Sequence, residues 1–370
     1  METPPGNQRR TFIKALGLLT VSVMGRPLVA KAALLKKIFP ASNTWPEIVD
    51  YARWCPTVHN MQPHRVKILS ADEAVLYCDT SRLLPVEDPE CKFVTVALGI
   101  FIEHLSIAAG FYNNKVDFEL LHDITLADKG VVAFARLKLA PSAEKETLNR
   151  DLIMQRRTSR LHYDGSPVSS DIISSLQNEA AAFNHHLYAT DDQELVSFII
   201  DQNQKTLFED LESGAVRGEL NGLFRYDREE AGTKKDGLWS ACMNFPGWLM
   251  RSVFQHHEKW DHGLKKTLIK DFYKASFHGT ATLGWFTGDF GNTAQWVNAG
   301  RMLARNWLFL TSRNIYIQPF GSLITNADAY KMMNDKLNIT GDKKLWMIFR
   351  MGHSKEPARS YRLDLKDLLI

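Results

Sequence analysis

Residues 94–109 read VTVALGIFIEHLSIAA. The apolar residues of this segment recur at the spacing of one helix face, so we expect a long helix with a buried side. Strand-like apolar runs flank it in pairs, at 66–69 and 74–78 before it and at 116–121 and 131–139 after it. A shorter helix is expected over 45–54.

The second half of the chain repeats part of this layout. Asp88 precedes Gly99 of the long helix by eleven residues, and Asp289 precedes Gly300 by eleven residues in a second expected helix, 295–312. Each helix then leads into an apolar extended run. The shared order and spacing predict an internal duplication.

The expected fold is α+β, with two antiparallel-rich sheets flanked by helices and the two long helices packed against each other. We expect a first half over residues 33–150 and a second half over 151–370. The second half carries an extra segment at about 214–279, rich in tryptophan. Insertions of this length are usually lids or binding segments.

Two short segments could carry chemistry, because no dinucleotide, nucleotide-triphosphate or metalloprotease motif occurs. The first is PTVHNMQP, residues 56–63, between the expected helix and strand. Two prolines would fix this loop, and short neutral groups on Thr57, Asn60 and Gln62 suit a planar heterocycle better than an anion. An ordinary proline-bounded turn is the competing interpretation.

The second segment is RRTSR, residues 156–160, followed by a turn at 164–167. Three guanidinium groups and two hydroxyl groups within five residues can clamp a phosphate, because arginine forks match phosphate oxygens. Solvated charge at a helix end would explain the same run.

Together, the patterns P-[ST]-x-x-N-x-Q-P and R-x-[ST]-x-R-x-[FY]-x-x-x-P-V resemble the nitroreductase family of FMN-dependent oxidoreductases. The resemblance implies an FMN cofactor and a three-layer fold. In that family each flavin lies at a dimer interface, between the arginine motif of one subunit and the loop of the other. Here each motif occurs once and in inverted order, which resembles the internally duplicated Acg-like branch and implies one flavin in a monomeric pseudo-dimer.

The resemblance also assigns site residues. The ring-contacting loop would be Pro56, Thr57, Val58, Asn60 and Gln62, and the phosphate and ribityl ligands would be Arg156, Arg157, Thr158 and Arg160. The family's closing segment returns one more cation to the phosphate, for which Arg362 is favoured over Arg359. The turn at Gly321 and Ser322 occupies the place where family backbone amides face the flavin ring.

The amino terminus resembles a twin-arginine signal peptide. QRRTFIK at 8–14 precedes a short apolar stretch, and an Ala-x-Ala site follows at 30–32, so we expect cleavage after Ala32 and export to the periplasm. A basic amphipathic helix or an uncleaved anchor is the alternative. The first 32 residues contain five Lys or Arg residues and one Glu, and without them the chain is nearly neutral. A nucleic-acid partner therefore has no support from composition.

These observations predict an exported flavoprotein that reduces a nitroaromatic or quinone-like acceptor with an unknown electron donor. The alternative is a protein that binds or sequesters FMN with little turnover, and a structural protein with a lost site is a third interpretation. His256, His257 and His262 are expected on a polar lid face and not at a metal. The four scattered cysteines are expected to serve packing.

Overall fold

The computed structural model describes residues 44–370, of which Glu47–Ile370 form one compact unit. The expected signal peptide and its cleavage site at Ala32 lie outside the described residues. Helix α3 (Trp45–Ala52) begins just before this unit.

The first sheet contains β1 (His64–Ile68), β2 (Glu73–Asp79), β3 (Asn114–Leu120) and β4 (Val131–Pro141) in the order β1-β2-β4-β3, with every neighbouring pair antiparallel. Helix α4 (Lys92–Gly110) connects β2 to β3. Buried and more exposed positions alternate along β3, as expected for a sheet with one face in solvent.

The second sheet has the same topology. Its strands β5 (His185–Thr190), β8 (Thr282–Gly288), β9 (Tyr316–Pro319) and β10 (Lys344–Gly352) lie in the order β5-β8-β10-β9, again all antiparallel. Helix α12 (Thr293–Ser312) connects β8 to β9. The α+β fold with two antiparallel sheets is thus confirmed, while an origin by duplication stays a prediction.

Strands β8 and β10 are buried almost throughout, because helices cover both faces of the second sheet. Helices α7 (Gln193–Asp210), α13 (Ser322–Thr325) and α14 (Ala327–Lys336) share an apolar core with one face. Phe286 and Phe349 stack on the opposite face, at a ring separation of 5.3 Å. Strands buried on both faces lose the alternating sequence pattern.

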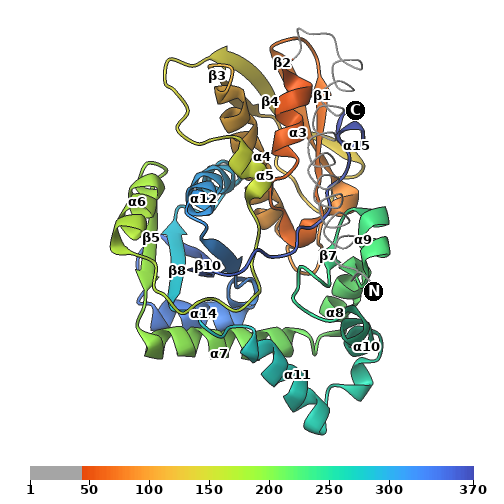
Figure 1. Ribbon diagram of the computed structural model, residues 1–370. Coiled ribbons are helices and arrows are strands. Elements are labelled where there is room, and N and C mark those ends of the chain that lie inside the picture. The colour runs from red at the N-terminus through yellow and green to blue at the C-terminus, as the bar shows by residue number, and fades with distance from the viewer. Residues whose placement is uncertain (1–43) are drawn as a thin grey trace, which may run out of the picture. The chain divides into compact units, whose positions relative to one another are not determined.

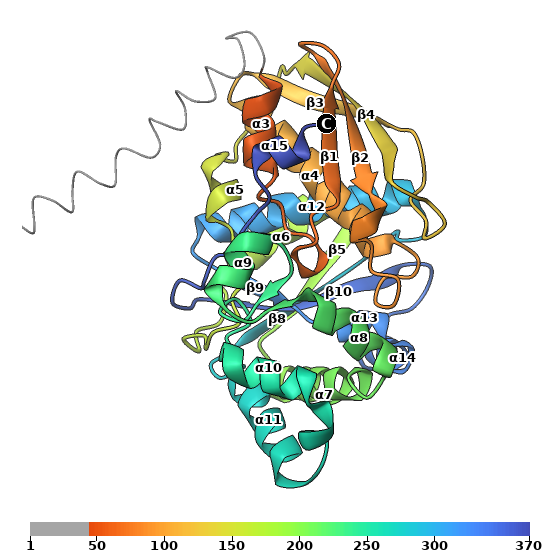
Figure 2. The same cartoon turned by 90° about the vertical axis from the view of Figure 1, so that its right-hand side faces the viewer.

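The two long helices lie between the sheets and pack against each other (Figures 1 and 2). A Cβ atom on Gly99 would lie 2.3 Å from the Val297 carbonyl oxygen, and one on Gly300 would lie 2.1 Å from the Val96 carbonyl oxygen. The contact is reciprocal, because Val297 lies three residues before Gly300 and Val96 lies three residues before Gly99. Glycine is therefore required at both positions for this close approach.

Helix α4 is also long and apolar enough to cross a membrane by length and composition, but most of it is buried inside the unit. It is a core helix of this fold.

The first two strands of each sheet are connected differently. A tight turn joins β1 to β2 in the first sheet, whereas a long helical segment separates the equivalent strands β5 and β8 in the second. This segment includes α7 and a satellite core around Leu220, Phe224 and Met250. Its other elements are α8 (Gly214–Leu223), β6 (Phe224–Arg225), α9 (Arg228–Lys234), β7 (Leu238–Trp239), α10 (Gly247–Gln255) and α11 (Gly263–Ala275). The remaining helices are α5 (Asp151–Gln155), α6 (Ser170–Ala181) and α15 (Leu365–Leu368), with short 3₁₀ turns at Val58–Asn60, Thr80–Arg82 and His257–Lys259.

Candidate cofactor site

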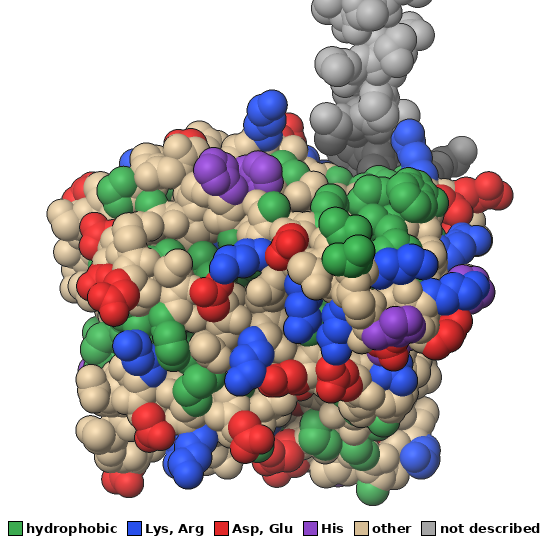
Figure 3. All heavy atoms as spheres, turned by 90° about the horizontal axis from the view of Figure 1, so that it is seen from below, with side chains coloured by type: hydrophobic (Ala, Val, Ile, Leu, Met, Phe, Trp, Pro, Cys, Tyr) green, Lys and Arg blue, Asp and Glu red, His purple; other side chains and the backbone are tan. Residues whose placement is uncertain are grey.

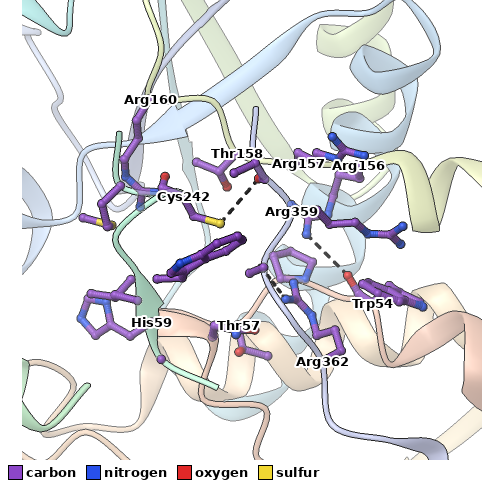
Figure 4. Close-up of a pocket in the computed structure, with 18 residues that line it drawn as sticks. Trp54, Thr57, His59, Arg156, Arg157, Thr158, Arg160, Cys242, Arg359 and Arg362 are labelled. Atoms are coloured by element: carbon purple, nitrogen blue, oxygen red, sulfur yellow. Dashed lines mark hydrogen bonds between the residues drawn. The ribbon is translucent and has the colours of Figure 1, made fainter. Parts of the chain in front are cut away.

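A cavity opens where four separate segments of the chain meet (Figure 4). It contains about 740 Å³ of empty space, part of which is open to solvent. Its walls are the loop after α3, the arginine run after α5, part of the β5–β8 segment and a stretch near the carboxyl terminus. The lining residues are Trp54, Pro56, Thr57, His59, Asn60, Arg156, Arg157, Thr158, Arg160, Gly237, Leu238, Trp239, Cys242, Met243, Ala358, Arg359, Ser360 and Arg362.

The loop that forms the first wall has an unusual backbone. His59, Asn60 and Gln62 have φ values of 46°, 60° and 55°, in the left-handed region that L-residues rarely occupy. Side chains hold this conformation: the Thr57 hydroxyl oxygen accepts a hydrogen bond from the Gln62 amide at 3.0 Å. Backbone strain of this kind persists where the surroundings fix it, and it is frequent at ligand sites.

Side-chain hydrogen bonds of Gln62 and Asn60 connect the loop to the β5–β8 segment and to the stretch near the carboxyl terminus. The Gln62 side chain donates to the Lys235 carbonyl at 2.8 Å and accepts from the Leu363 amide at 2.9 Å. The Asn60 side-chain nitrogen donates to the Tyr361 carbonyl at 3.1 Å. Gln62 is therefore a structural connector, buried behind the loop, whereas Asn60 lines the cavity.

The arginine run is held in an extended conformation against the second sheet. Thr158 forms a parallel bridge to Ile317 of β9. Arg350 of β10, fully buried, donates to the carbonyl oxygens of Leu161 at 2.9 Å and Ser159 at 3.4 Å. A buried guanidinium thus positions the backbone of the run, and sequence reasoning missed it because a lone arginine in an apolar strand gives no sign of its partners.

Five arginines line the cavity, and among the described residues no aspartate or glutamate does. Burial, with repulsion from Arg362, lowers the pKa of Arg156 to about 9. Burial also lowers the pKa values of Arg359 and Arg362 to about 10. The protonated guanidinium groups therefore lie in a region that disfavours positive charge until an anion joins them.

Several polar atoms around this cluster have no hydrogen-bond partner among the described residues. They are the Nε atoms of Arg156, Arg157, Arg359 and Arg362, the Nη2 atom of Arg359 and the Oδ1 atom of Asn60. Buried polar groups are almost always paired, so the unpaired donors of the arginine run and of the carboxyl-terminal stretch fit an anionic ligand with several acceptor oxygens.

The existing contacts of Arg157 and Arg359 leave both arginines able to bind such a ligand. Arg157 donates to the Pro357 carbonyl at 2.8 Å and pairs with Glu356, whose side chain is mostly exposed and does not line the cavity. Arg359 stacks over the Trp54 ring at 3.6 Å. The aromatic ring holds the guanidinium plane and leaves its edge free to donate.

The β5–β8 segment forms the wall opposite the loop. The Cys242 carbonyl accepts from Arg160 at 3.1 Å, and the Cys242 thiol donates to the Ala358 carbonyl at 3.5 Å. Burial raises the pKa of this thiol above its usual value. The Trp239 ring lies 5.5 Å from the Tyr361 ring. This wall is apolar apart from the thiol, which suits contact with a flat ring system.

The structure brings most of the sequence-predicted residues together. Pro56, Thr57, Asn60, Arg156, Arg157, Thr158, Arg160 and Arg362 all line the cavity. Val58 instead lines a smaller cavity with Val94 and Ala97 of α4. Gly321 and Ser322 lie at the start of α13 and do not line the cavity, because the buried Phe320 directs this turn toward the core beneath the sheet.

Other lining residues were outside the predicted set. Arg359 lines the cavity beside Arg362, and His59 lines it beside Asn60. The segment expected to be a lid contributes Gly237, Leu238, Trp239, Cys242 and Met243, but nothing in its sequence indicated which of its residues would reach the site. Within the described residues, no group of three or more His, Cys, Asp or Glu side chains is placed to hold a metal ion.

No family model and no curated protein sequence matches the chain. Similar solved structures include an FMN-bound nitroreductase from Bacteroides fragilis NCTC 9343 (12% identity, TM-score 0.35, covering 58% of this chain and 92% of that one). A second is an FMN-dependent nitroreductase from Mycobacterium smegmatis in complex with NADPH (15% identity, TM-score 0.35, covering 58% of this chain and 94% of that one). A third is an FMN- and NADPH-dependent nitroreductase from sphigopyxis sp. strain HMH (11% identity, TM-score 0.37, covering 60% of this chain and 96% of that one). At these identities and TM-scores the likeness does not extend to function, which has to be inferred from the cavity itself.

Proposed function

We propose that the cavity binds one FMN and that the protein is an FMN-dependent oxidoreductase of the nitroreductase type, reducing a nitroaromatic or quinone-like acceptor. The observation that carries this proposal is the set of unpaired guanidinium donors beside a rigid, proline-bounded loop, in a cavity whose described lining has no carboxylate. The sequence patterns of both segments support the same conclusion.

The residues present fit the chemical parts of FMN. Arg157, Thr158 and Arg160 would hold the phosphate and the ribityl chain, with Arg156, Arg359 and Arg362 adding positive charge. The neutral loop of Pro56, Thr57 and Asn60 would lie along the ring, with Trp239 and Met243 on the opposite wall. Bound FMN would supply the redox chemistry, and the chain would contribute orientation and shielding from water.

Purification gives the first test. The protein should be yellow, and the flavin that it releases on denaturation should run as FMN in chromatography. The double variant Arg157→Ala/Arg160→Ala should lose the flavin, whereas Arg136→Ala, which removes an exposed arginine on β4, should retain it. Full retention by the double variant would exclude this cavity as the FMN site.

A second candidate function is FMN binding or sequestration with little turnover, and the wall formed by residues 237–243 favours it, because it covers one side of the cavity. Anaerobic photoreduction followed by addition of a nitroaromatic or a quinone distinguishes the two functions. Rapid reoxidation supports the oxidoreductase, and a flavin that stays reduced supports sequestration.

We further propose export by the twin-arginine route, on the strength of QRRTFIK at residues 8–14. This route carries folded proteins, which suits a cofactor inserted before export. Replacing Arg9 and Arg10 by lysine should leave the protein in the cytoplasm of a fractionated bacterial host, with its flavin bound. NAD(P)H is not freely available outside the cytoplasm, so the electron donor would be another reductant.

A further inference from the structure

One histidine of the cavity wall, His59, is paired with a carboxylate that does not line the cavity. The His59 Nε2 atom lies 2.5 Å from the Glu87 Oε2 atom, and the two side chains are 22% and 23% exposed. Other histidines lie at the outer surface in contact with solvent (Figure 3), whereas His59 faces the space where a ligand would bind. The imidazole is therefore positioned to act on a molecule in the cavity.

The backbone that carries Glu87 is fixed by contacts on both of its sides. The Glu219 carboxylate of α8 accepts hydrogen bonds from the Val86 and Glu87 amides, each at 3.0 Å. The next residue, Asp88, accepts from the Val94 amide at the start of α4. Because this short stretch is held to two helices, the Glu87 carboxylate is a defined partner for the histidine ring and not a mobile surface charge.

The pairing leaves one ring nitrogen of His59 available to a ligand. Glu87 engages Nε2, and Nδ1 has no hydrogen-bond partner within residues 44–370. A histidine with one nitrogen held by a carboxylate has a fixed orientation and tautomer, and its other nitrogen can exchange a proton with a bound molecule. When Nδ1 also carries a proton, the carboxylate balances the positive charge of the ring.

His59 lies away from the end of the cavity that suits a phosphate. Figure 4 shows His59 at one end and Arg156, Arg157 and Arg359 toward the other. These three arginines hold most of the unpaired guanidinium donors of the described lining, so an FMN phosphate would bind at their end. The flavin ring would then extend toward the end where His59 lies.

We propose that His59, oriented by Glu87, gives a proton to the acceptor as the acceptor is reduced, an inference that rests on the proposed oxidoreductase function. A quinone becomes a hydroquinone by gaining two electrons and two protons. Both electrons and one proton would come from the reduced flavin, which is thereby oxidised. The second proton would leave Nδ1 of His59 and bind to a quinone oxygen, and solvent would then return a proton to Nδ1.

Reoxidation of the photoreduced holoprotein tests this role with two oxidants, 1,4-benzoquinone and ferricyanide, because ferricyanide accepts one electron and no proton. His59→Asn suits the test, since asparagine tolerates the left-handed backbone at this position and cannot act as an acid. It should slow the reaction with benzoquinone by about 100-fold, within the usual contribution of a positioned acid, and leave the reaction with ferricyanide unchanged.

A matched control is His122→Asn, which removes the histidine of a surface pair with Asp128, and it should react with both oxidants like the wild type. His59→Gly also fits the left-handed backbone and leaves room for imidazole from solution. Added imidazole should restore the benzoquinone reaction of this variant. The FMN dissociation constants of both His59 variants, measured by fluorescence, should stay within about twofold of the wild type, because His59 serves the acceptor and not the phosphate.

The role of Glu87 can be measured without flavin. In ¹⁵N NMR spectra of the flavin-free protein, at a pH where the ring is neutral, Nε2 of His59 should carry the proton. Glu87→Gln, whose side-chain oxygen still accepts a hydrogen bond, should keep this tautomer, whereas Glu87→Ala should lose the preference. A proton found on Nδ1 in the wild type would overturn the orienting role of Glu87.

Wild-type reoxidation of His59→Asn by benzoquinone would overturn the proposal. Equal slowing with benzoquinone and ferricyanide would also overturn it, because this would show a general effect on the flavin and not on proton delivery. Failure of the proposed function gives a different result: the wild-type protein would hold no FMN, or would hold reduced flavin that benzoquinone does not oxidise, and the inference about His59 would fall with it.

Discussion

The arginines of the cavity differ in how many of their guanidinium nitrogens already donate to an acceptor in the protein. Arg362 donates to the Ser360 hydroxyl at 2.6 Å and to the Tyr361 carbonyl at 3.1 Å, and it is almost fully buried. Two nitrogen atoms of Arg359 have no hydrogen-bond partner within residues 44–370, and its guanidinium group lies over the Trp54 ring. Arg362 therefore organises the carboxyl-terminal wall, whereas Arg359 is available to a ligand.

This difference predicts different outcomes for two substitutions. Arg359→Ala should weaken FMN binding by about 1.5–3 kcal/mol, the usual contribution of a hydrogen bond to a charged group, and leave the unfolding free energy of the flavin-free protein unchanged or slightly higher. Arg362→Ala should lower both FMN affinity and stability. Fluorescence titration with FMN and urea denaturation measure the two quantities. Equal destabilisation by both variants would contradict this assignment.

The crossing of α4 and α12 depends on its two glycines, because the backbone oxygens of Val297 and Val96 occupy the space that a side chain would need. Gly99→Ala and Gly300→Ala should each destabilise the protein by about 2 kcal/mol, since forcing the helices apart outweighs the gain in helix propensity.

Gly218→Ala in α8 is the matched control, because no atom lies within 4 Å of the added Cβ. It should be neutral or stabilising by up to about 1 kcal/mol. Thermal unfolding of the three variants measures the effect. Wild-type stability in Gly99→Ala and Gly300→Ala would show that the helices can separate without cost.

At the level of elements, the sequence predicted the parts whose pattern is local. The long helices and the strands of the first sheet are found within a few residues of their expected positions, because each has a periodic apolar face. Strand β5 and strand β8 were missed. Strand β8 is covered on both faces, so its residues do not alternate, and two glycines interrupt its strand-favouring Thr, Trp and Phe residues.

The matched spacing of Asp88 and Asp289 does not reflect a shared contact. The Asp88 carboxylate accepts from the Val94 amide at 2.8 Å at the start of α4. Asp289 pairs with Lys343 instead, and Asn292 caps α12 by accepting from the Gln295 amide. Spacing located the two helices correctly, but only Asp88 binds amides at the start of its own helix, whereas the partner of Asp289 lies 54 residues away in sequence.

The candidate site follows the same rule. The loop at 56–60 and the arginine run at 156–160 could be recognised because each is contiguous and has a distinctive composition. Their meeting in one cavity, and the contributions of Trp54 and Trp239, arise from tertiary packing that no local pattern encodes.

For the molecule as a whole, buried histidines predict acid sensitivity. Burial lowers the pKa of His185 to about 4 and the pKa values of His64 and His104 well below 6.5. The unfolded chain binds protons at these residues below about pH 6.5, whereas the folded protein does not. Stability should therefore be complete above pH 6.5 and fall as the pH decreases toward 4.

We expect a loss of about 2 kcal/mol or more between pH 7 and pH 5, measured by urea denaturation at both pH values. His185→Gln should reduce this dependence, whereas His186→Gln, at the exposed neighbouring position, should not. A free energy of unfolding that is constant from pH 7 to pH 5 would refute the expectation.

The four-walled cavity has one further consequence, for the behaviour of the protein at low concentration. Its loop and its arginine run belong to the same chain and are joined through the crossing of α4 and α12, so folding alone brings them together. A site assembled from two subunits comes apart when the subunits are diluted. This one does not depend on encounter, so a molecule released singly into a large volume would keep its binding site intact.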